Sequence, residues 1–240
     1  MKQLRSAHSF FLFTLLLLLS ACVPYLTHYN KAQESFNEAA ELDNKLKLKI
    51  EDEEDFELLS PKSQVQIKYL TALNAIDKVL RGNTGKLQQD GLLASAYTIK
   101  ALSEWKTERY DASIATARNG LSALAKAKSA GMKAMPRDAA ILTAIPGLIK
   151  ADQAADMVKA PQEQRNYENI ANKVQNGLND IDVALEQAPK GHPVKKYLYT
   201  VKLAMLETWL TASADLKGDT GREASQKIMK MQKEVRDLMK

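Results

Sequence analysis

The residue types that most often carry out chemistry in proteins are scarce in this chain of 240 residues. It contains one cysteine, Cys22, and three histidines. A single cysteine excludes an internal disulfide, a CxxC redox pair and a zinc site built from cysteines. His28 and His192 each lack a second histidine at a ligand spacing, so we expect no metal site. The motifs GxSxG, HExxH, GxGxxG and the P-loop do not occur either.

Carboxylates are the remaining candidates for acid–base catalysis. Two of them lie in strongly apolar segments close to a tryptophan: Glu104 precedes Trp105, and Glu207 lies two positions before Trp209. A glutamate buried in a cleft has a shifted pKa and can act as a catalytic acid. We expect instead that each glutamate points outward while the tryptophan packs inward. The protein is therefore predicted not to be an enzyme and to need no cofactor.

The composition is that of a protein that can bury a core. Hydrophobic residues make up 45% of the chain and charged residues 26%. Ten glycines and seven prolines are too few for a collagen-like or low-complexity protein. The formal net charge is +5, but the lysines and arginines are scattered among acids rather than gathered in a basic stripe. We therefore predict no nucleic-acid partner.

The N-terminal segment has the three parts of a secretory signal. Lys2 and Arg5 give it a positive start, residues 10–19 form an apolar run in which only Thr14 is polar, and small residues follow. The run is too short to cross a ~30 Å hydrocarbon core, which needs about 20 residues. These features together predict a signal peptide over residues 1–21.

The end of this segment, Leu19-Ser20-Ala21-Cys22, resembles the lipobox of bacterial lipoproteins. The resemblance implies cleavage between Ala21 and Cys22, a diacylglycerol on the Cys22 thiol and an acyl chain on the new amine. Each buried CH₂ contributes ~0.8 kcal/mol, so two or more chains anchor a protein stably. Val23 stands where the family often has an aspartate that retains the protein in the inner membrane. The resemblance thus implies an outer-membrane protein whose body faces the periplasm, with the inner membrane as the alternative.

Helix signals dominate the mature chain. Apolar residues recur at spacings of three and four, and prolines and glycines separate segments of about 20–28 residues. One such break is expected at Gly82-Asn83-Thr84-Gly85. The pattern predicts helices over residues 25–45, 62–81, 87–105, 108–130, 137–158, 163–187, 194–217 and 220–239.

The short connections predict an all-α fold of antiparallel hairpins, with about seven or eight helices after the signal peptide. Residues 22–61 are expected to form a lipid-anchored helix and a charged linker, and residues 62–240 a helical-repeat domain. The acidic run at residues 51–55 suits a solvated linker better than a cation site. Pro146 predicts a kink or break in the helix over 137–158.

The last two helices differ in their apolar faces. The helix over 194–217 has two such faces, one through Tyr197 and Val201 and one through Leu198 and Met205. Two apolar faces predict burial on both sides. The helix over 220–239 has a single apolar stripe, which is typical of a helix that closes a stack.

Three segments resemble the second helix of a tetratricopeptide repeat, in which chosen residues follow spacings of three, four and three. They are Tyr29-Ala32-Phe36-Ala39, Tyr110-Ser113-Ala117-Gly120 and Val174-Gly177-Ile181-Ala184, the last followed by Pro189. The resemblance implies that these positions pack the hairpins together, with small residues allowing close approach. The first-helix pattern of the family is absent, and the segments are not separated by multiples of the 34-residue repeat. We expect a tetratricopeptide-like solenoid, with a generic helical solenoid or bundle as the alternative.

Two functions fit these features. The first is a membrane-anchored scaffold or adaptor that binds a protein partner in the cell envelope, where the anchor raises the local concentration. The alternative is a lipoprotein that binds a small molecule and is associated with solute uptake. A tyrosine-lined groove would suit the first and a deep cavity with convergent polar groups the second. The helical tyrosines are Tyr69, Tyr97, Tyr110, Tyr167, Tyr197 and Tyr199, and core packing is the simpler explanation of each.

Overall fold

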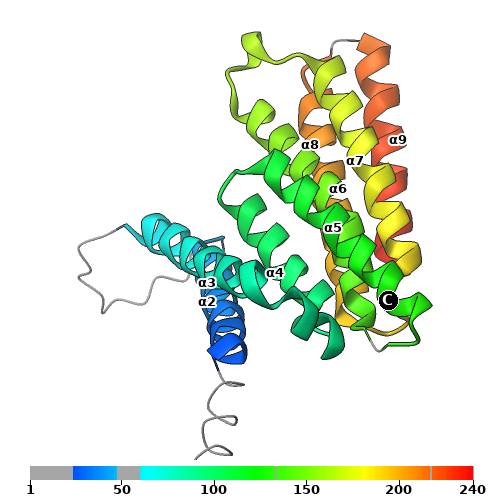
Figure 1. Ribbon diagram of the computed structural model, residues 1–240. Coiled ribbons are helices and arrows are strands. Elements are labelled where there is room, and N and C mark those ends of the chain that lie inside the picture. Colours follow the sequence, from blue (N-terminus) through cyan, green and yellow to red (C-terminus); the bar gives the residue numbers. More distant parts are fainter. Residues whose placement is uncertain (1–23, 48–59, 133, 217, 240) are drawn as a thin grey trace, which may run out of the picture.

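The computed structural model describes residues 24–47, 60–132, 134–216 and 218–239, and this part of the chain is all α-helical (Figure 1). The predicted all-α class is therefore confirmed. The helices are α2 (Pro24–Lys47), α3 (Pro61–Gln89), α4 (Leu93–Lys106), α5 (Tyr110–Ser129), α6 (Pro136–Lys159), α7 (Tyr167–Gln187), α8 (Pro193–Ser213) and α9 (Gly218–Leu238), with a short 3₁₀ turn at Gln162–Gln164.

The helices pack as four sequential hairpins, α2/α3, α4/α5, α6/α7 and α8/α9. Each hairpin also contacts the next one through its first helix, so that α2, α4, α6 and α8 follow one another through the molecule. Helix α6 contacts α4, α5, α7 and α8 and is the central element. Short connections bring consecutive helices side by side, which is why the pairing follows the chain order.

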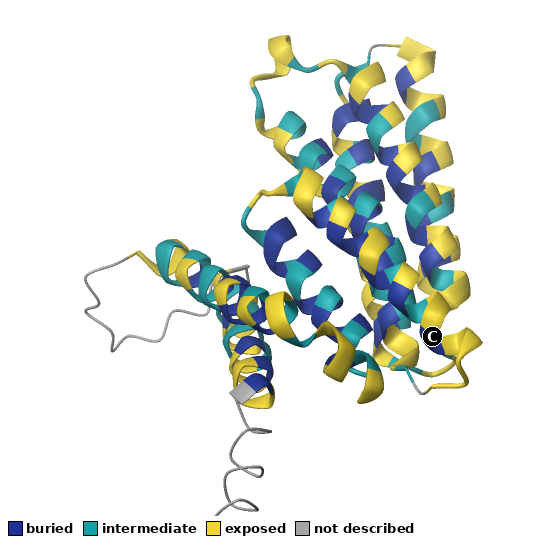
Figure 2. Cartoon of the chain, in the orientation of Figure 1, coloured by how far each residue is buried: buried dark blue, intermediate teal, exposed yellow. Residues whose placement is uncertain are grey.

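The hydrophobic core follows this arrangement. Buried residues run along the facing sides of the helices, while the outer sides are exposed (Figure 2). The largest cluster joins residues from α4 to α9, and its centre on α6 includes Leu142, Ile145 and Leu148, all essentially inaccessible to solvent. Full burial of such a side chain contributes about 1.5–3 kcal/mol. Two smaller clusters join α2 to α3 and α4.

The break predicted at residues 82–85 is present as a kink rather than as a turn. Asn83 has non-helical backbone angles, with φ −133°, and α3 continues beyond this kink to Gln89. The chain turns instead at Gly91, which adopts a φ of 71°. Leu87 explains the difference, because it is fully buried in the cluster with α2 and keeps the last turns of α3 in place. Glycine supplies the left-handed conformation that the real turn requires.

Other helix boundaries also shift from their predicted positions. Pro146 does not break α6, which runs from Pro136 to Lys159. Helix α7 begins at Tyr167 rather than 163, because Asn166 caps it by accepting a hydrogen bond from the backbone amide of Asn169 at 2.9 Å. The acidic run at 51–55 lies outside the described residues.

The prediction that α8 is buried on two sides is wrong for one of them. Leu198 and Met205 are buried, as expected, but Tyr197 is 45% exposed and Ala204 is exposed. Val201 and Thr208 on the same face are half-buried. Helix α9 has the predicted single stripe, in which Ile228 is fully buried.

Candidate functional site

The position of the predicted anchor is limited by the start of α2. Ala21 and Cys22, the predicted cleavage and lipidation residues, lie outside the described residues, but α2 begins at Pro24. Only Val23 separates Cys22 from this helix. Consecutive Cα atoms are 3.8 Å apart, so the Cα of Cys22 lies within about 8 Å of that of Pro24. The predicted acyl group on Cys22 would therefore hold the first turn of α2 next to a membrane.

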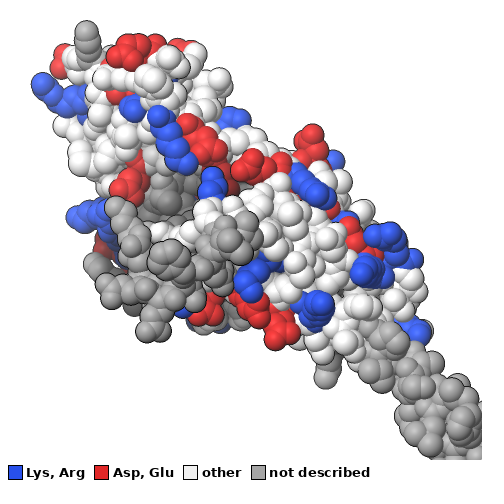
Figure 3. Space-filling view, turned by 90° about the vertical axis from the view of Figure 1, so that its left-hand side faces the viewer, with Lys and Arg blue, Asp and Glu red and all other residues white. Residues whose placement is uncertain are grey.

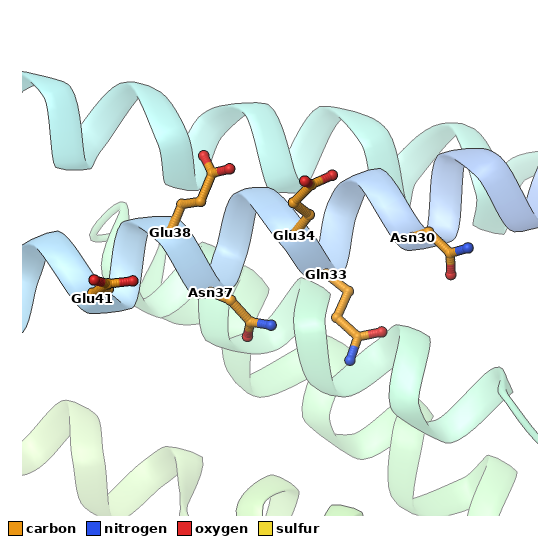
Figure 4. A pocket seen from close by; sticks show the side chains of 6 residues that line it. All are labelled: Asn30, Gln33, Glu34, Asn37, Glu38 and Glu41. Atoms are coloured by element: carbon orange, nitrogen blue, oxygen red, sulfur yellow. The ribbon is translucent and has the colours of Figure 1, made fainter.

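A polar hollow of about 530 Å³ runs along α2 (Figure 4). We call it the α2 groove. In Figure 4, Asn30, Gln33 and Asn37 follow one side of the helix, and Glu38 points toward α3. There the Lys68 ammonium group donates to the Glu38 carboxylate at 2.6 Å. The lining residues are Asn30, Gln33, Glu34, Asn37, Glu38 and Glu41.

The opposite side of α2 explains why this groove faces outward. Tyr25, Tyr29, Ala32 and Ala39 are buried at spacings of four, three and seven residues, on one face of the helix. Phe36 continues this face and packs on Tyr69 of α3 with ring centroids 5.5 Å apart. Because apolar residues occupy one face, the amides and carboxylates are left on the other. The groove therefore belongs to a helix whose orientation is set by packing.

The lining groups determine what the α2 groove can bind. Carboxylates accept hydrogen bonds and attract cationic side chains, and amide groups both donate and accept. These groups complement a polar, basic peptide segment and repel phosphate. The described residues contain no cluster of three His, Cys, Asp or Glu side chains that could hold a metal ion.

His192 contributes to the start of α8. Its Nδ1 accepts a hydrogen bond from the Val194 amide at 3.1 Å and thereby caps the helix.

Most of the predicted repeat-packing positions are on buried faces. Phe36, Tyr110 and Pro189 are half-buried. The other ten are buried: Tyr29, Ala32, Ala39, Ser113, Ala117, Gly120, Val174, Gly177, Ile181 and Ala184.

Two of the small residues sit at close helix contacts. A Cβ at Gly120 would lie 2.7 Å from Leu142 Cδ1, and one at Gly177 would lie 3.1 Å from Lys150 Cβ. Both distances are shorter than ordinary van der Waals contact, so glycine favours the close approach of α6 to α5 and α7.

The repeat register fits only two of the three segments. Those in α5 and α7 lie on the second helix of a hairpin, as the resemblance implies. The segment from Tyr29 to Ala39 lies on α2, which is the first helix of its hairpin. The same three-four-three spacing arises in any helix that packs one face on a neighbour, which is why it did not distinguish the two positions.

A buried polar cluster connects α2, α4 and α6. The Ser95 hydroxyl donates to the Asp138 carboxylate at 2.5 Å, and Asp138 is only 1% exposed. Burial raises the pKa of Asp138, although hydrogen bonds from Ser95 and Thr98 oppose the shift. Burial likewise raises the pKa of the neighbouring Tyr29. A serine and an aspartate closed off from solvent lack the access that catalysis needs. The cluster instead joins three hairpins, and sequence inspection missed it because Asp138 looks like an ordinary first-turn acid of α6.

The expectation that Glu104 points outward is wrong. Its side chain is buried, and Lys100 lies 3.4 Å from one carboxylate oxygen while also pairing with Asp77. Burial lowers the pKa of Lys100, but these two carboxylates outweigh that effect and raise it. Glu104 is held inward because α4 is covered on most sides, by α2, α3, α5 and α6.

Three buried polar atoms near Glu104 do not form a ligand site. The Ser103 hydroxyl, the second Glu104 carboxylate oxygen and the Trp105 indole nitrogen have no hydrogen-bond partner within the described structure. Consecutive residues of an α-helix point about 100° apart, so these atoms cannot converge on one ligand.

The expectation that the glutamate points outward and the tryptophan inward holds for Glu207 and Trp209. Glu207 is exposed, and the buried Trp209 donates to the Tyr167 hydroxyl at 3.1 Å.

The helical tyrosines differ in their exposure to solvent. Tyr69 is buried, and burial raises its pKa. Tyr197 is the exposed member of the set. The others, Tyr97, Tyr110, Tyr167 and Tyr199, are half-buried.

Acidic and basic side chains are interspersed on the face of the molecule shown in Figure 3. No helix in the described part of the chain is long and apolar enough to span a membrane. Comparison with known families, curated proteins and solved structures gave no match.

Proposed function

We propose that the protein is a lipid-anchored scaffold or adaptor of the bacterial cell envelope, held at the outer membrane with its body in the periplasm. The lipobox-like segment supports the anchor, since it places the sole cysteine directly after a signal peptide. The short step from Cys22 to Pro24 supports a body that stays close to the membrane.

The α2 groove is the observation that carries the binding role. It is open, it lies on the helix that follows the anchor, and its amides and carboxylates are free of the apolar packing that fixes α2. A surface already held in place loses little conformational entropy on binding. The partner is a protein segment that offers backbone amides and basic side chains to Asn37, Glu34 and Glu41.

The hairpin stack supports a tetratricopeptide-like solenoid as the framework for this role. Contacts between successive hairpins run through α2, α4, α6 and α8, the arrangement expected when repeated hairpins stack in one direction. Stacked repeats present long rows of side chains to a partner. Helix α2 lies in the first described hairpin, where one side remains open for binding.

Site-specific crosslinking tests the binding role. A photoreactive amino acid placed at Asn37 should capture one envelope protein, whereas the same group at the exposed Met229 of α9 should not. Capture of the same proteins from both positions would contradict the proposal. Protection of position 37 by a small molecule, without a protein adduct, would instead favour the solute-binding alternative.

A charge-reversal variant shows whether the carboxylates of the α2 groove are responsible for the crosslink. Glu34→Lys combined with Glu41→Lys should reduce the crosslink from position 37 at least tenfold, because it removes attraction for basic side chains. The matched control is Glu223→Lys with Glu234→Lys, which changes the net charge equally on exposed positions of α9. An equal loss in both variants would show that overall charge, and not the α2 groove, governs capture.

A further inference from the structure

The lower end of the molecule in Figure 1 is formed by parts that are distant in sequence. The start of α2, the connections α3–α4, α5–α6 and α7–α8, and the end of α9 all lie there. Contacts connect these parts: the Lys86 ammonium group is 5.7 Å from the ring centre of Tyr25, and Gln88 donates to the sulfur of Met132 at 3.6 Å. We call this surface the anchor end, because Pro24 lies on it.

The anchor end carries an excess of exposed cations. Its acids include Asp90, which accepts a hydrogen bond from Tyr25, the buried Asp138 beside Arg137, and the exposed Glu186 and Asp237. Within the described residues, no carboxylate forms an ion pair with any of its exposed cations. These cations include Lys86, Lys126, Lys128, Arg137, Lys190 and Lys196.

Several cations at the opposite end form ion pairs with neighbouring acids at 2.7 to 3.2 Å. The pairs are Lys106 with Asp43, Lys159 with Asp156 and Arg165 with Asp215. The anchor-end cations named above differ from these three, because they have no ion pair within the described residues.

Helix dipoles account for only part of this pattern. Lys86, Lys126 and Lys128 lie in the last turns of α3 and α5, where a cation stabilises the helix. Arg137 and Lys196 lie in the first turns of α6 and α8, where the dipole disfavours a positive charge. Arg137 is offset by the neighbouring Asp138 carboxyl group, and an external negative surface would stabilise both cations at this end.

Apolar side chains are exposed among these cations. Met132 and Met135 are 40% and 48% exposed on the α5–α6 connection, and Leu26 and Leu238 are also exposed. Interfacial regions of a bilayer accept such side chains beside lysines that reach the headgroups.

We infer that the anchor end rests on anionic phospholipid headgroups and orients the body with α3–α4, α5–α6 and α7–α8 against the membrane. The inference rests on the proposed lipid anchor, which holds Pro24 within reach of the bilayer. It adds that charge and exposed apolar side chains fix the orientation, so that the opposite end and the α2 groove stand away from the lipid. Cations near an anionic leaflet are attracted to it, and salt weakens that attraction.

A quenching experiment on the acylated protein measures this orientation. Since Cys22 is the sole cysteine and is acylated, a fluorophore can be attached to a new cysteine, at Ala130→Cys on the anchor end or Gln162→Cys on the opposite end. The vesicles contain equal parts of phosphatidylcholine and phosphatidylglycerol and a headgroup-linked quencher. The label at 130 should be quenched several-fold more than the label at 162, and high salt should shrink the difference. Equal quenching, or a difference insensitive to salt and to removal of phosphatidylglycerol, would overturn the inference.

Charge reversal provides the matched variant. Lys128→Glu with Lys190→Glu should abolish most of the difference between the two labels. Lys62→Glu with Lys227→Glu changes the net charge equally at exposed positions away from the anchor end and should leave the difference intact. If both double variants behave alike, the anchor-end cations do not set the orientation.

Failure of the anchor itself would look different. A protein without acyl chains would not float with pure phosphatidylcholine vesicles, and that result counts against the proposed function. The cations of the anchor end would still predict flotation of this protein with the phosphatidylglycerol vesicles at low salt. If it did not float with those vesicles, the inference about the anchor end would be overturned, whatever the state of the acyl anchor.

Discussion

Asp138 is a carboxyl group buried where α2, α4 and α6 meet. Burial raises its pKa above the usual 3.8, so just above that pH the folded state binds more protons than the unfolded state. Stability therefore falls as the pH rises through this window, and at neutral pH the buried charge weakens the fold.

Asp138→Asn should relieve this effect, because an amide oxygen still accepts the Ser95 hydrogen bond without a charge. We expect the variant to gain stability over the parent near neutral pH and to gain less near pH 4. Urea unfolding at the two pH values measures the difference. A loss of stability of equal size at both would mean that the carboxylate is required for its hydrogen bonds and not penalised by burial.

Single residues also show what the sequence could predict. The absence of known catalytic motifs is read from the sequence alone, and the lipidation of Cys22 remains a prediction from it. Burial of Glu104 and Asp138 does not, because it depends on how many neighbours surround α4 and the start of α6. Nothing in the local spacing of Glu104 separates it from the exposed Glu207.

At the scale of elements, α6 and α7 depend on a close backbone contact. A Cβ at Gly147 would lie 2.9 Å from the Gly177 carbonyl oxygen, and a backbone atom cannot move aside as a flexible side chain can. Gly147→Ala should therefore destabilise the fold by about 1–3 kcal/mol.

The control for Gly147 is Gly85→Ala in α3. A Cβ at Gly85 meets nothing within 4 Å, so this change should stabilise the protein by about 0.4–1 kcal/mol. Thermal unfolding of the detergent-solubilised protein followed by circular dichroism compares the two. Similar effects of both substitutions would show that helix propensity, and not the α6–α7 contact, decides the outcome.

Helix types were predictable and several helix ends were not. The three- and four-residue spacing identified all eight described helices, because each packs at least one apolar face. Gly82 and Gly85 suggested a turn, yet the buried Leu87 holds α3 together beyond them. A local glycine pattern cannot reveal that tertiary contact, whereas the turn at Gly91 is set by its positive φ.

At the scale of the molecule, the proposed anchor sets where the protein works. Cys22→Ser should abolish acylation and release the protein from the membrane, because the acyl chains on Cys22 are the proposed anchor. Ser20→Ala keeps a small residue before the predicted cleavage position and should leave both intact. Metabolic labelling with a fatty acid, followed by membrane fractionation, measures the two effects. Continued labelling of Cys22→Ser would rule out Cys22 as the acylated residue.

The order of helix packing could be predicted from short connections, but the central role of α6 could not. Its contacts with α4, α5, α7 and α8 depend on the angle between hairpins, which side-chain spacing does not specify. The same limit explains the exposed Tyr197, since an apolar face predicts burial only when a neighbouring hairpin covers it. The α2 groove and the basic anchor end likewise emerge only when distant segments are placed together.

Native mass spectrometry of protein gently extracted from membranes tests the central claim most directly. The account predicts a mature chain that begins at Cys22, carries the mass of its acyl chains and is bound to an envelope protein at a fixed stoichiometry. A chain without acyl mass would contradict the anchor. An acylated chain that retains only a small molecule, with no protein partner, would contradict the scaffold function.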